Sequence, residues 1–441
     1  MHAPVFAKIT TEIPGPTSRS LCQEESQYLA PGIQQISTLA GLAMAGGEGA
    51  LLLDVDGNRF IDWVAGIGVA SIGHGHPALA QALFEQASQL SSTSFASPAR
   101  LELLRRIVEH APHPSLDRVQ LYSSGAEAVE SALRLARAAT GHREVVAFWG
   151  GFHGKTHGVI GLCGSEFKHG QLPILPGQHL APYADCSRCA LRQTPDTCQL
   201  ACIDFLRDQL RLATAADVAA ILVEPIQGTA GNVVPHPDFL PSLAQVAKEH
   251  GALLIADEMI TGFGRTGSLW ASPDAGLTPD IVIFGKGVAA GFPLSGLITR
   301  KELATARPWS DPSHSSSSFG GNPLACAAAN ATTRIIIEQD LATHAKAVGA
   351  QLVAGLERLA ARFPSIQRVR GRGLLIGFDL MDGPVLWSKD RCVALFRACL
   401  ARGLLTMTYT PRVRINPPLV VSAAQVEESL ALFADALQSV S

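Results

Sequence analysis

With 441 residues, of which 47% are hydrophobic and 17% charged, the chain is expected to be globular and to contain more than one domain. Its formal charge of −3 excludes the cationic excess that binding to nucleic acid or to an anionic membrane requires. Neither a signal peptide nor a membrane-spanning stretch is visible, so we expect a cytoplasmic protein, and the apolar composition predicts a homo-oligomer.

The first half of the chain contains a predicted hairpin and the first strands of a predicted sheet. "GALLLDVDGNRFIDW", residues 49–63, predicts a hairpin with Asp56-Gly57 as its turn. Further along, short apolar runs are each followed by a polar turn: "RVQLY" by "SSGAEA", "REVVAF" by "WGGFHGKT", "AAILV" by "EPIQG", "GALLIA" by "DEMITG" and "DIVIF" by "GKG". Runs of this kind predict the buried strands of a parallel sheet.

Helical patterns alternate with these strands, at Ala126–Ala139, Cys198–Leu212 and Phe239–His250. Residues 66–325 therefore form a predicted large α/β domain, in which ligands bind at the carboxyl ends of the strands. After "FGGNPLACAAAN" come amphipathic helices and "RVRGRGLLIGFDL", which predicts one strand. We expect residues 1–65 and 326–441, from both chain ends, to form a smaller α+β domain.

Two of the polar turns carry residues suited to a cofactor. Lys286, between two glycines at the end of an apolar strand, faces a crevice in which desolvation lowers the pKa of an amine and allows a Schiff base with an aldehyde. A lone lysine at a strand end commonly reaches solvent, so this position alone is weak support. Asp257 ends the preceding strand, where a buried carboxylate needs a cation such as a protonated pyridine nitrogen.

Two further turns complete the pattern. Ser124, Gly125 and Ala126 lie between a strand and a helix start, where free backbone N–H groups favour a phosphate. Phe152 and His153 offer an aromatic face for stacking on a planar ring. A lysine, an aspartate, a phosphate cradle and an aromatic face together describe a site for pyridoxal 5′-phosphate.

The chain resembles the class III aminotransferases, fold type I pyridoxal-phosphate enzymes that include 4-aminobutyrate and ornithine transaminases. The resemblance runs over nearly the whole chain, through "DVDGNRFIDWVAGIGVASIGHGHP", "LYSSGAEAVESALRLAR", "GGFHGKT", "VEPIQG", "DEMITGFGRTG", "FGKG", "FGGNPLACAAA" and "VRINPPLV". It implies a large domain with a mostly parallel sheet, a smaller domain built from both chain ends, and a homodimer with shared active sites. It also implies ping-pong transfer of an amino group from an amine, diamine or ω-amino acid to a 2-oxo acid.

The resemblance assigns roles to individual residues. Lys286 would be the Schiff-base lysine and proton carrier, and Asp257 the partner of the pyridinium nitrogen. The other residues implied in cofactor binding are Ser124, Gly125, Ala126, Phe152, His153, Glu224, Met259 and, reaching the neighbouring subunit's cofactor, Ser318. Arg414 would bind the substrate's α-carboxylate through its planar guanidinium, and Ile67 would form a wall of the substrate pocket.

Three departures from the family bear on the substrate. Ile260 stands where the family often has a glutamine that bonds the cofactor's phenolic oxygen. Thr229 replaces the glutamate that masks the C-terminal arginine in 4-aminobutyrate enzymes. Lys155 replaces the arginine that binds the distal carboxylate in those enzymes, and it keeps the charge without the bidentate fork. The donor and acceptor therefore stay open.

Other functions compete with transamination. The same cofactor chemistry also supports an amino-acid racemase or a decarboxylating transaminase. "GFGRTG", residues 262–267, fits a dinucleotide fingerprint, but prolines and turn residues follow it instead of a helix. Four cysteines, Cys186, Cys189, Cys198 and Cys202, have spacings that allow zinc or an iron–sulfur cluster. They are otherwise free thiols of a surface insertion, and a metal-binding or redox protein is the third alternative.

Overall fold

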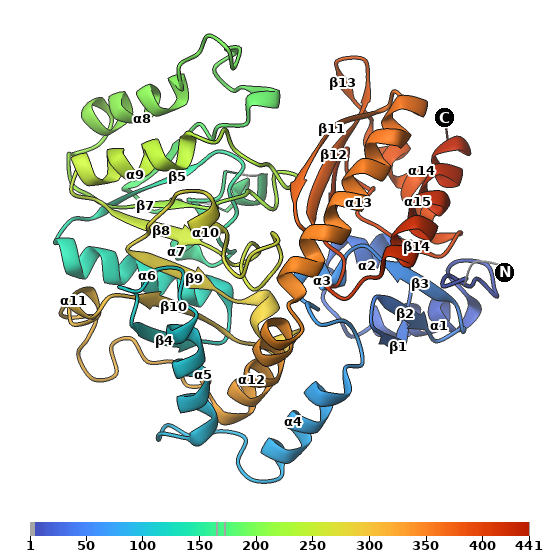
Figure 1. The fold of residues 1–441 in the computed structure, drawn as a ribbon, viewed down its shortest axis with the longest axis horizontal. Helices are drawn as coiled ribbons and strands as arrows, with labels where there is room; N and C mark the ends of the chain where they lie inside the picture. Colours follow the sequence, from blue (N-terminus) through green and yellow to red (C-terminus); the bar gives the residue numbers. More distant parts are fainter. Residues whose placement is uncertain (1–4, 165, 172, 441) are drawn as a thin grey trace.

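A computed structural model describes residues 5–164, 166–171 and 173–440, and its largest element is a seven-stranded sheet (Figure 1). The strand order is β4-β10-β9-β8-β7-β5-β6; the neighbours from β9 to β6 run parallel, and β10 is antiparallel to both β4 and β9. The strands are β4 (Arg118–Tyr122), β5 (Glu144–Phe148), β6 (Gln178–Ala181), β7 (Val218–Val223), β8 (Leu253–Asp257), β9 (Ile281–Phe284) and β10 (Ser295–Thr299). The predicted, mostly parallel sheet is confirmed.

Helices cover both faces of this sheet. Ile281 and Ile283 of β9 pack in one apolar cluster with α6 (Gly125–Thr140). Alternate residues of the same strand pack in another cluster, with α8 (Ala201–Leu212) and α9 (Phe239–Glu249) on the opposite face. Because both faces are buried, the strands read as unbroken apolar runs in the sequence.

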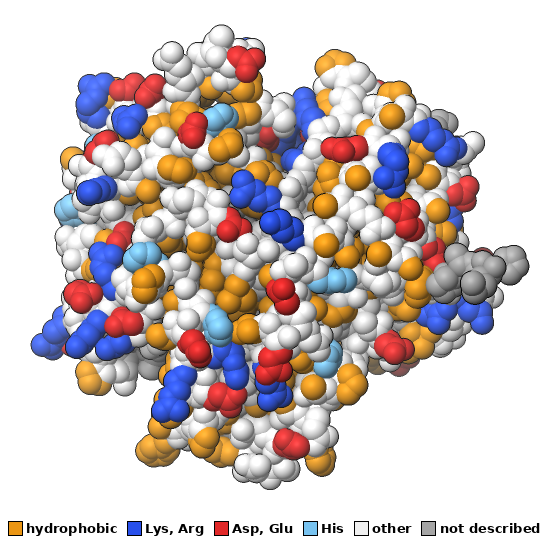
Figure 2. Space-filling view, in the orientation of Figure 1, with side chains coloured by type: hydrophobic (Ala, Val, Ile, Leu, Met, Phe, Trp, Pro, Cys, Tyr) orange, Lys and Arg blue, Asp and Glu red, His pale blue; other side chains and the backbone are white. Residues whose placement is uncertain are grey.

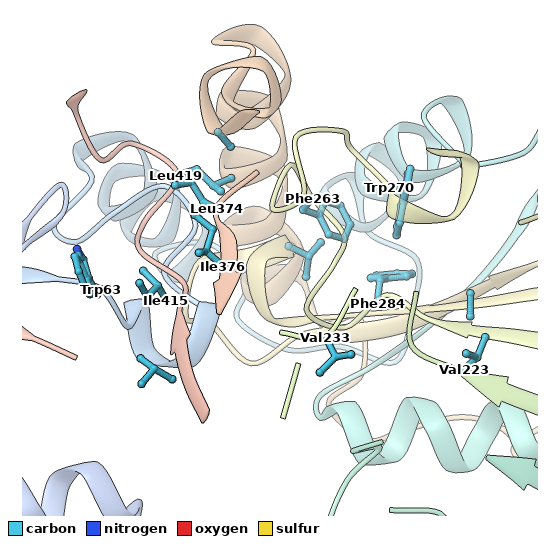
Figure 3. Packing of buried hydrophobic residues seen from close by; sticks show 14 of the residues in the cluster. Trp63, Val223, Val233, Phe263, Trp270, Phe284, Leu374, Ile376, Ile415 and Leu419 are labelled. Carbon is cyan, nitrogen blue, oxygen red and sulfur yellow. The ribbon is translucent and has the colours of Figure 1, made fainter. Parts of the chain in front are cut away.

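The second apolar cluster extends beyond the sheet and joins it to the C-terminal part of the chain. Figure 3 labels part of this continuous packing, including Phe263, Trp270, Phe284, Ile376, Ile415 and Leu419. The rings of Phe263 and Trp270 have centroids 4.8 Å apart, and those of Phe263 and Phe284 5.9 Å. The two parts of the molecule therefore share one hydrophobic core.

Two smaller sheets lie to the right in Figure 1 and combine segments from both chain ends. The first contains β1 (Met44–Glu48), β2 (Leu51–Asp54), β3 (Arg59–Asp62) and β14 (Leu404–Leu405), and β14 pairs in parallel with β3. The second contains β11 (Ile366–Arg372), β12 (Leu375–Asp382), β13 (Val385–Leu386) and β15 (Arg412–Ile415). The carboxylate of Glu428 also accepts hydrogen bonds from the backbone N–H groups of Phe6 and Ala7, each at 2.8 Å.

Most predicted elements form, with two corrections. The prediction of one strand over "RVRGRGLLIGFDL" is wrong, because β11 and β12 form an antiparallel hairpin that turns at Gly373, a residue with φ of 54°. The helix predicted from Cys198 begins only at Ala201, since Gln199 and Leu200 have left-handed φ values of 47° and 59°. The hairpin predicted around Asp56-Gly57 is present as β2 and β3.

The remaining elements connect these layers. The helices are α1 (Pro16–Glu25), α2 (Gln35–Ala40), α3 (Ala65–Gly68), α4 (Pro77–Ala87), α5 (Pro98–Glu109), α7 (His157–Ile160), α10 (Ala271–Asp274), α11 (Lys301–Ala304), α12 (Pro323–Glu338), α13 (Leu341–Arg362), α14 (Lys389–Leu400) and α15 (Ala423–Gln438), and the 3₁₀ turns are η1 (Glu166–Lys168), η2 (Cys186–Arg188) and η3 (Lys286–Ala289). The domain boundaries stay predictions, and α12 spans the second of them. No helix in the described part of the chain has the length and apolarity to cross a membrane.

Candidate active site

A cavity of about 320 Å³ lies where β8 and β9 end. Its lining includes most of the residues that the sequence singled out for cofactor binding, namely Gly125, Ala126, Phe152, His153, Asp257, Met259 and Lys286. These residues come from four different connections that follow strands. The carboxyl ends of the strands therefore bring them together, as expected for a sheet of this kind.

Lys286 lines the cavity at the first position of η3, directly after β9. A glycine precedes it because the chain passes close to Met259: a Cβ at Gly285 would lie 2.3 Å from the sulfur of Met259. Burial lowers the pKa of the Lys286 amine, although the carboxylates of Asp257 and Glu224 act in the opposite direction. An amine with a lowered pKa loses its proton more readily and can act as nucleophile or base.

Asp257 is buried and both of its carboxylate oxygens have partners. Oδ2 lies 2.8 Å from Nδ1 of His153, and Oδ1 accepts the backbone N–H of Met259 at 3.0 Å. Burial by itself would lower the pKa of His153, but the hydrogen bond and the charge of Asp257 outweigh it, so the pKa is raised. His153 therefore donates to Asp257 and fixes the orientation of the carboxylate at the cavity.

Glu224, directly after β7, links two loops around the cavity. Its Oε1 accepts the N–H of Phe152 at 2.8 Å and its Oε2 accepts the N–H of Gly228 at 2.9 Å. Burial raises the pKa of its carboxyl group, with the charge of His153 opposing this. The Tyr183 hydroxyl donates to the Glu224 carbonyl at 3.1 Å. Glu224 thus holds the Phe152 loop in position.

The N-terminus of α6 faces the cavity through Gly125 and Ala126. Ser124 caps the helix, because its hydroxyl accepts the N–H of Glu127 at 3.3 Å and the Glu127 carboxylate accepts the N–H of Ser124 in return. The serine that lines the cavity is Ser123, which the sequence analysis did not single out. In the part of the chain that the structure describes, its buried hydroxyl has no hydrogen-bond partner. The double serine in "SSGAEA" was the available signal.

Two of the predicted residues outside this lining are exposed. Ser318 is exposed, on the loop before α12. Lys155 is exposed as well, and its Nζ lies 4.8 Å from the ring centroid of Phe167. Phe167, another residue that the sequence analysis missed, packs edge-on against Phe152 with centroids 5.4 Å apart. Lys155 is therefore connected to the cavity through two aromatic rings.

Ile67 and Arg414 come from the segments at the two chain ends. Ile67 lies in a left-handed turn, with φ of 68°, and packs in an apolar cluster that includes Tyr409. Arg414 lies on β15 opposite Gly377, and its partly buried side chain lies near Tyr409. Burial lowers the pKa of Arg414, and the nearby Tyr409 and Glu224 act against that shift. Tyr409 was not predicted from the sequence.

The four cysteines of the insertion are free and partly buried. Cys186 begins η2, and Cys202 lies in the first turn of α8. Burial and the proximity of Cys198 raise the pKa of Cys186, and burial raises that of Cys202 to about 11. Among residues 5–164, 166–171 and 173–440, no three His, Cys, Asp or Glu side chains are arranged to hold a metal ion.

The "GFGRTG" segment has a structural role. Arg265 in this segment is buried, and its guanidinium donates to the Leu374 carbonyl at 3.2 Å and to the Pro417 carbonyl. The next helix, α10, begins only at Ala271 and has four residues. The segment thus fastens the loop after β8 to the C-terminal part of the chain, and it lacks the following helix of a dinucleotide site.

The cavity fits pyridoxal 5′-phosphate. Lys286 supplies an amine for the aldehyde, and Asp257 supplies a buried carboxylate for a protonated ring nitrogen. The N–H groups of Gly125 and Ala126 have no acceptor within their own helix, and the unpartnered Ser123 hydroxyl lies beside them, so the three form a cradle for phosphate.

Comparisons with known proteins agree with this site. Residues 35–437 match the family model described as aminotransferase class-III. The chain is 33% identical over 431 residues to 5-aminovalerate aminotransferase DavT of Pseudomonas aeruginosa. This alignment covers 95% of this chain and 98% of the relative. It is also 33% identical over 447 residues to an alanine/serine racemase of Pyrococcus horikoshii, covering 98% of this chain and 93% of the relative.

Among solved structures, an (S)-enantioselective omega-transaminase from Thermomicrobium roseum is 30% identical and superimposes with a TM-score of 0.89, over 96% of this chain and 98% of that one. The likeness thus extends over the sequence and the whole fold. The chain belongs to the class III aminotransferase family, and it is a pyridoxal-phosphate-dependent aminotransferase of fold type I.

Proposed function

We propose that this protein transfers an amino group from an amine, diamine or ω-amino acid to a 2-oxo acid, in two half-reactions at the cavity where β8 and β9 end. The observation that carries the proposal is one cavity lined by an amine of lowered pKa, Lys286, and a buried carboxylate, Asp257. The donor class is supported by a similar relative whose name specifies 5-aminovalerate, an ω-amino acid.

Each residue of the cavity has a separate role in this proposed reaction. Pyridoxal phosphate, when bound, withdraws electrons from the carbon that carries the substrate's amino group. Lys286 would bind the aldehyde through its amine between turnovers, and once the donor has freed that amine it would carry a proton from the substrate carbon to the carbon of the aldehyde. Asp257, fixed by His153, keeps the ring nitrogen protonated. Gly125, Ala126 and Ser123 hold the phosphate through their N–H and hydroxyl groups.

The remaining pocket residues orient the two substrates. Phe152, held through Glu224, stacks on the cofactor ring, with Met259 on the cavity wall. Arg414 binds the α-carboxylate of the 2-oxo acid, for which a guanidinium has the right geometry. Ile67 contacts the alkyl part of the donor, and Lys155 attracts a distal carboxylate.

We also propose a cytoplasmic homodimer in which Ser318 reaches the phosphate bound by the partner. Large apolar side chains are exposed on and beside α4, α5 and α12, of which α12 packs against the other two; they include Phe84 at 72%, Phe95 at 82% and Phe319 at 67%. Figure 2 shows orange side chains along the lower edge, where Figure 1 places α4 and α5. A second copy would bury this surface, and nine free thiols suit a reducing compartment.

A racemase is the second candidate, because one similar relative is named as an alanine/serine racemase. A racemase returns the proton to the opposite face of the same carbon and leaves the amino group in place. It needs no 2-oxo acid. The two functions therefore differ in the fate of the substrate nitrogen.

The fate of the nitrogen is the basis of the experiment. Purified protein loaded with pyridoxal phosphate is mixed with ¹⁵N-labelled donors, with and without a 2-oxo acid, and the products are examined by mass spectrometry. We expect the label in the amino acid formed from the 2-oxo acid, and neither this transfer nor the visible band of the lysine-bound cofactor in Lys286→Ala. Inversion of an α-amino acid that keeps its own label would favour the racemase. Lack of a visible band in the wild-type protein would contradict the cofactor assignment.

A further inference from the structure

A second cavity, of about 80 Å³, lies where three segments of the chain meet. Pro225 and Ile226 line it from the loop after β7, Thr266 from the loop after β8, and Arg372 from the end of β11. Its lining shares no residue with the cavity that contains Lys286. Because a water molecule in the liquid takes up about 30 Å³, this cavity has room only for a small molecule.

Thr266 gives the cavity a buried polar group that lacks a partner. The residue is 6% exposed, and among the residues that the structure describes its hydroxyl has no hydrogen-bond partner. The turn of the β11–β12 hairpin packs directly on it, since a Cβ at Gly373 would lie 2.4 Å from the carbonyl carbon of Thr266. An unpaired buried hydroxyl costs free energy, and a bound molecule with a polar group would remove that cost.

Two opposite charges line the same cavity without pairing. Arg372 and Asp274 of α10 are both exposed, and Asp274 accepts a hydrogen bond from the Ser268 hydroxyl. Within the described part of the chain, neither forms an ion pair within 4.0 Å. The guanidinium and the carboxylate are therefore more than 4.0 Å apart. A molecule that carries both an ammonium and a carboxylate group can bridge this gap.

The rest of the lining fits the body of such a molecule. The Nδ1 atom of His236 accepts the N–H of Asp238 at 3.3 Å, which leaves Nε2 as a donor for a carboxylate. The other lining residues are prolines and aliphatic residues, so they offer no partner for a polar side chain of the ligand. The volume and the apolar wall together favour a small α-amino acid such as glycine or alanine.

We propose that this cavity binds a small α-amino acid in its zwitterionic form. Asp274 takes the ammonium group, Arg372 and His236 take the carboxylate, and Thr266 adds a hydrogen bond from the buried side. This site is separate from the cavity of the proposed reaction, because the two linings have no residue in common. The inference therefore holds or fails independently of the proposed function.

The experiment is equilibrium dialysis of the cofactor-loaded protein against ¹⁴C-glycine, without a 2-oxo acid. Arg372→Gln and Asp274→Asn each remove one charge, and each should weaken glycine binding about fivefold, a modest loss because solvent screens exposed charges. Unlabelled acetate and methylammonium, which each carry one of the two charges, should compete about fivefold less well than glycine. Arg397→Gln is the matched control, because it removes an exposed arginine from α14 and should leave binding unchanged.

Thr266→Val tests the buried side of the cavity. Valine has nearly the shape of threonine but no hydroxyl, so the variant should bind glycine about threefold more weakly. Without glycine, its unfolding temperature should not fall, since the lost hydroxyl had no partner. Thermal unfolding of every variant verifies that the fold is intact.

Weaker binding in both charge variants, with poor competition by acetate and methylammonium, supports the site. Equal binding by the wild-type protein and both charge variants would place glycine in the Lys286 cavity and overturn the inference. A loss in only one charge variant, or equal competition by acetate, would show a site for a single charge and overturns it as well. So does the absence of glycine binding. None of these outcomes bears on transamination, which the ¹⁵N experiment tests by itself.

Discussion

The two ends of the active site differ in how firmly their charged groups are held. At the end proposed for the cofactor ring, Asp257 and Glu224 are buried, and the four oxygens of their carboxylates accept hydrogen bonds at 2.8–3.0 Å. At the end proposed for substrate, Arg414 has a neutral tyrosine beside it and Lys155 has an aromatic ring. A rigid end suits a permanent cofactor, whereas cations with weak partners suit substrates that alternate.

The largest effect is expected when the carboxylate charge of Asp257 is removed from the cofactor end of the site. Asp257→Asn keeps the shape but removes the carboxylate that would pair with the ring nitrogen. We expect kcat to fall about 10²–10⁴-fold, the range associated with loss of a positioned proton-transfer group, measured with saturating cofactor. Thermal unfolding and the bound-cofactor spectrum serve as controls. A loss below tenfold would contradict the assigned role.

A smaller change removes the support of the carboxylate and leaves the carboxylate in place. His153→Asn breaks the 2.8 Å contact with Asp257, and we expect kcat to fall about tenfold, less than in Asp257→Asn. The pKa of His153 is higher in the folded protein than in the unfolded chain, where it is about 6.5. Protonated His153 therefore stabilises the folded protein fully below about pH 6.5, and this stabilisation is lost as the pH rises through the pKa of the folded state.

The wild-type protein should therefore exceed His153→Asn in unfolding temperature most clearly near pH 6, with the gap narrowing as pH rises. Melting curves across this range, with the cofactor omitted, measure the effect. A gap that widens with rising pH would show that His153 is not protonated in the folded state.

The smallest effect is expected at the end of the site proposed for substrate. Lys155→Ala removes an exposed cation that is worth about 0.5–1 kcal/mol over an aromatic face. We expect kcat/KM for an ω-amino acid to fall less than about fivefold and that for an amine without a distal carboxylate to stay unchanged. Lys155→Arg, which keeps the charge, is the matched control. Equal losses for both donors would remove Lys155 from substrate recognition.

The same contrast explains how much the sequence could predict. Lys286 and Asp257 follow apolar runs that are buried on both sides, so the end of each run marked the edge of the sheet at which they meet. Ser123 was missed, because the sequence does not show which of two adjacent serines caps α6. Tyr409 was missed, since its proximity to Arg414 depends on the packing of α14 against the loop before β15.

Irregular segments account for what the sequence left open. The hairpin of β11 and β12 was read as one strand, although Gly371 and Gly373 lie close together at the point where the chain turns. The grouping of the four cysteines depends on the course of a long connection between β6 and α8, which no periodicity describes. Contacts that follow regular strands were predictable, and those made by irregular segments were not.

The pairing of β3 with β14 has a consequence for the order of synthesis. Leu404 is translated long after Asp62, and at about 5–20 residues per second the N-terminal strands wait on the order of 20–70 s for their neighbour. During that interval the edge of β3 and the backbone of Phe6 and Ala7 lack their C-terminal partners. The ends of the chain are thus joined last, and a nascent chain interrupted before residue 404 carries an open strand edge.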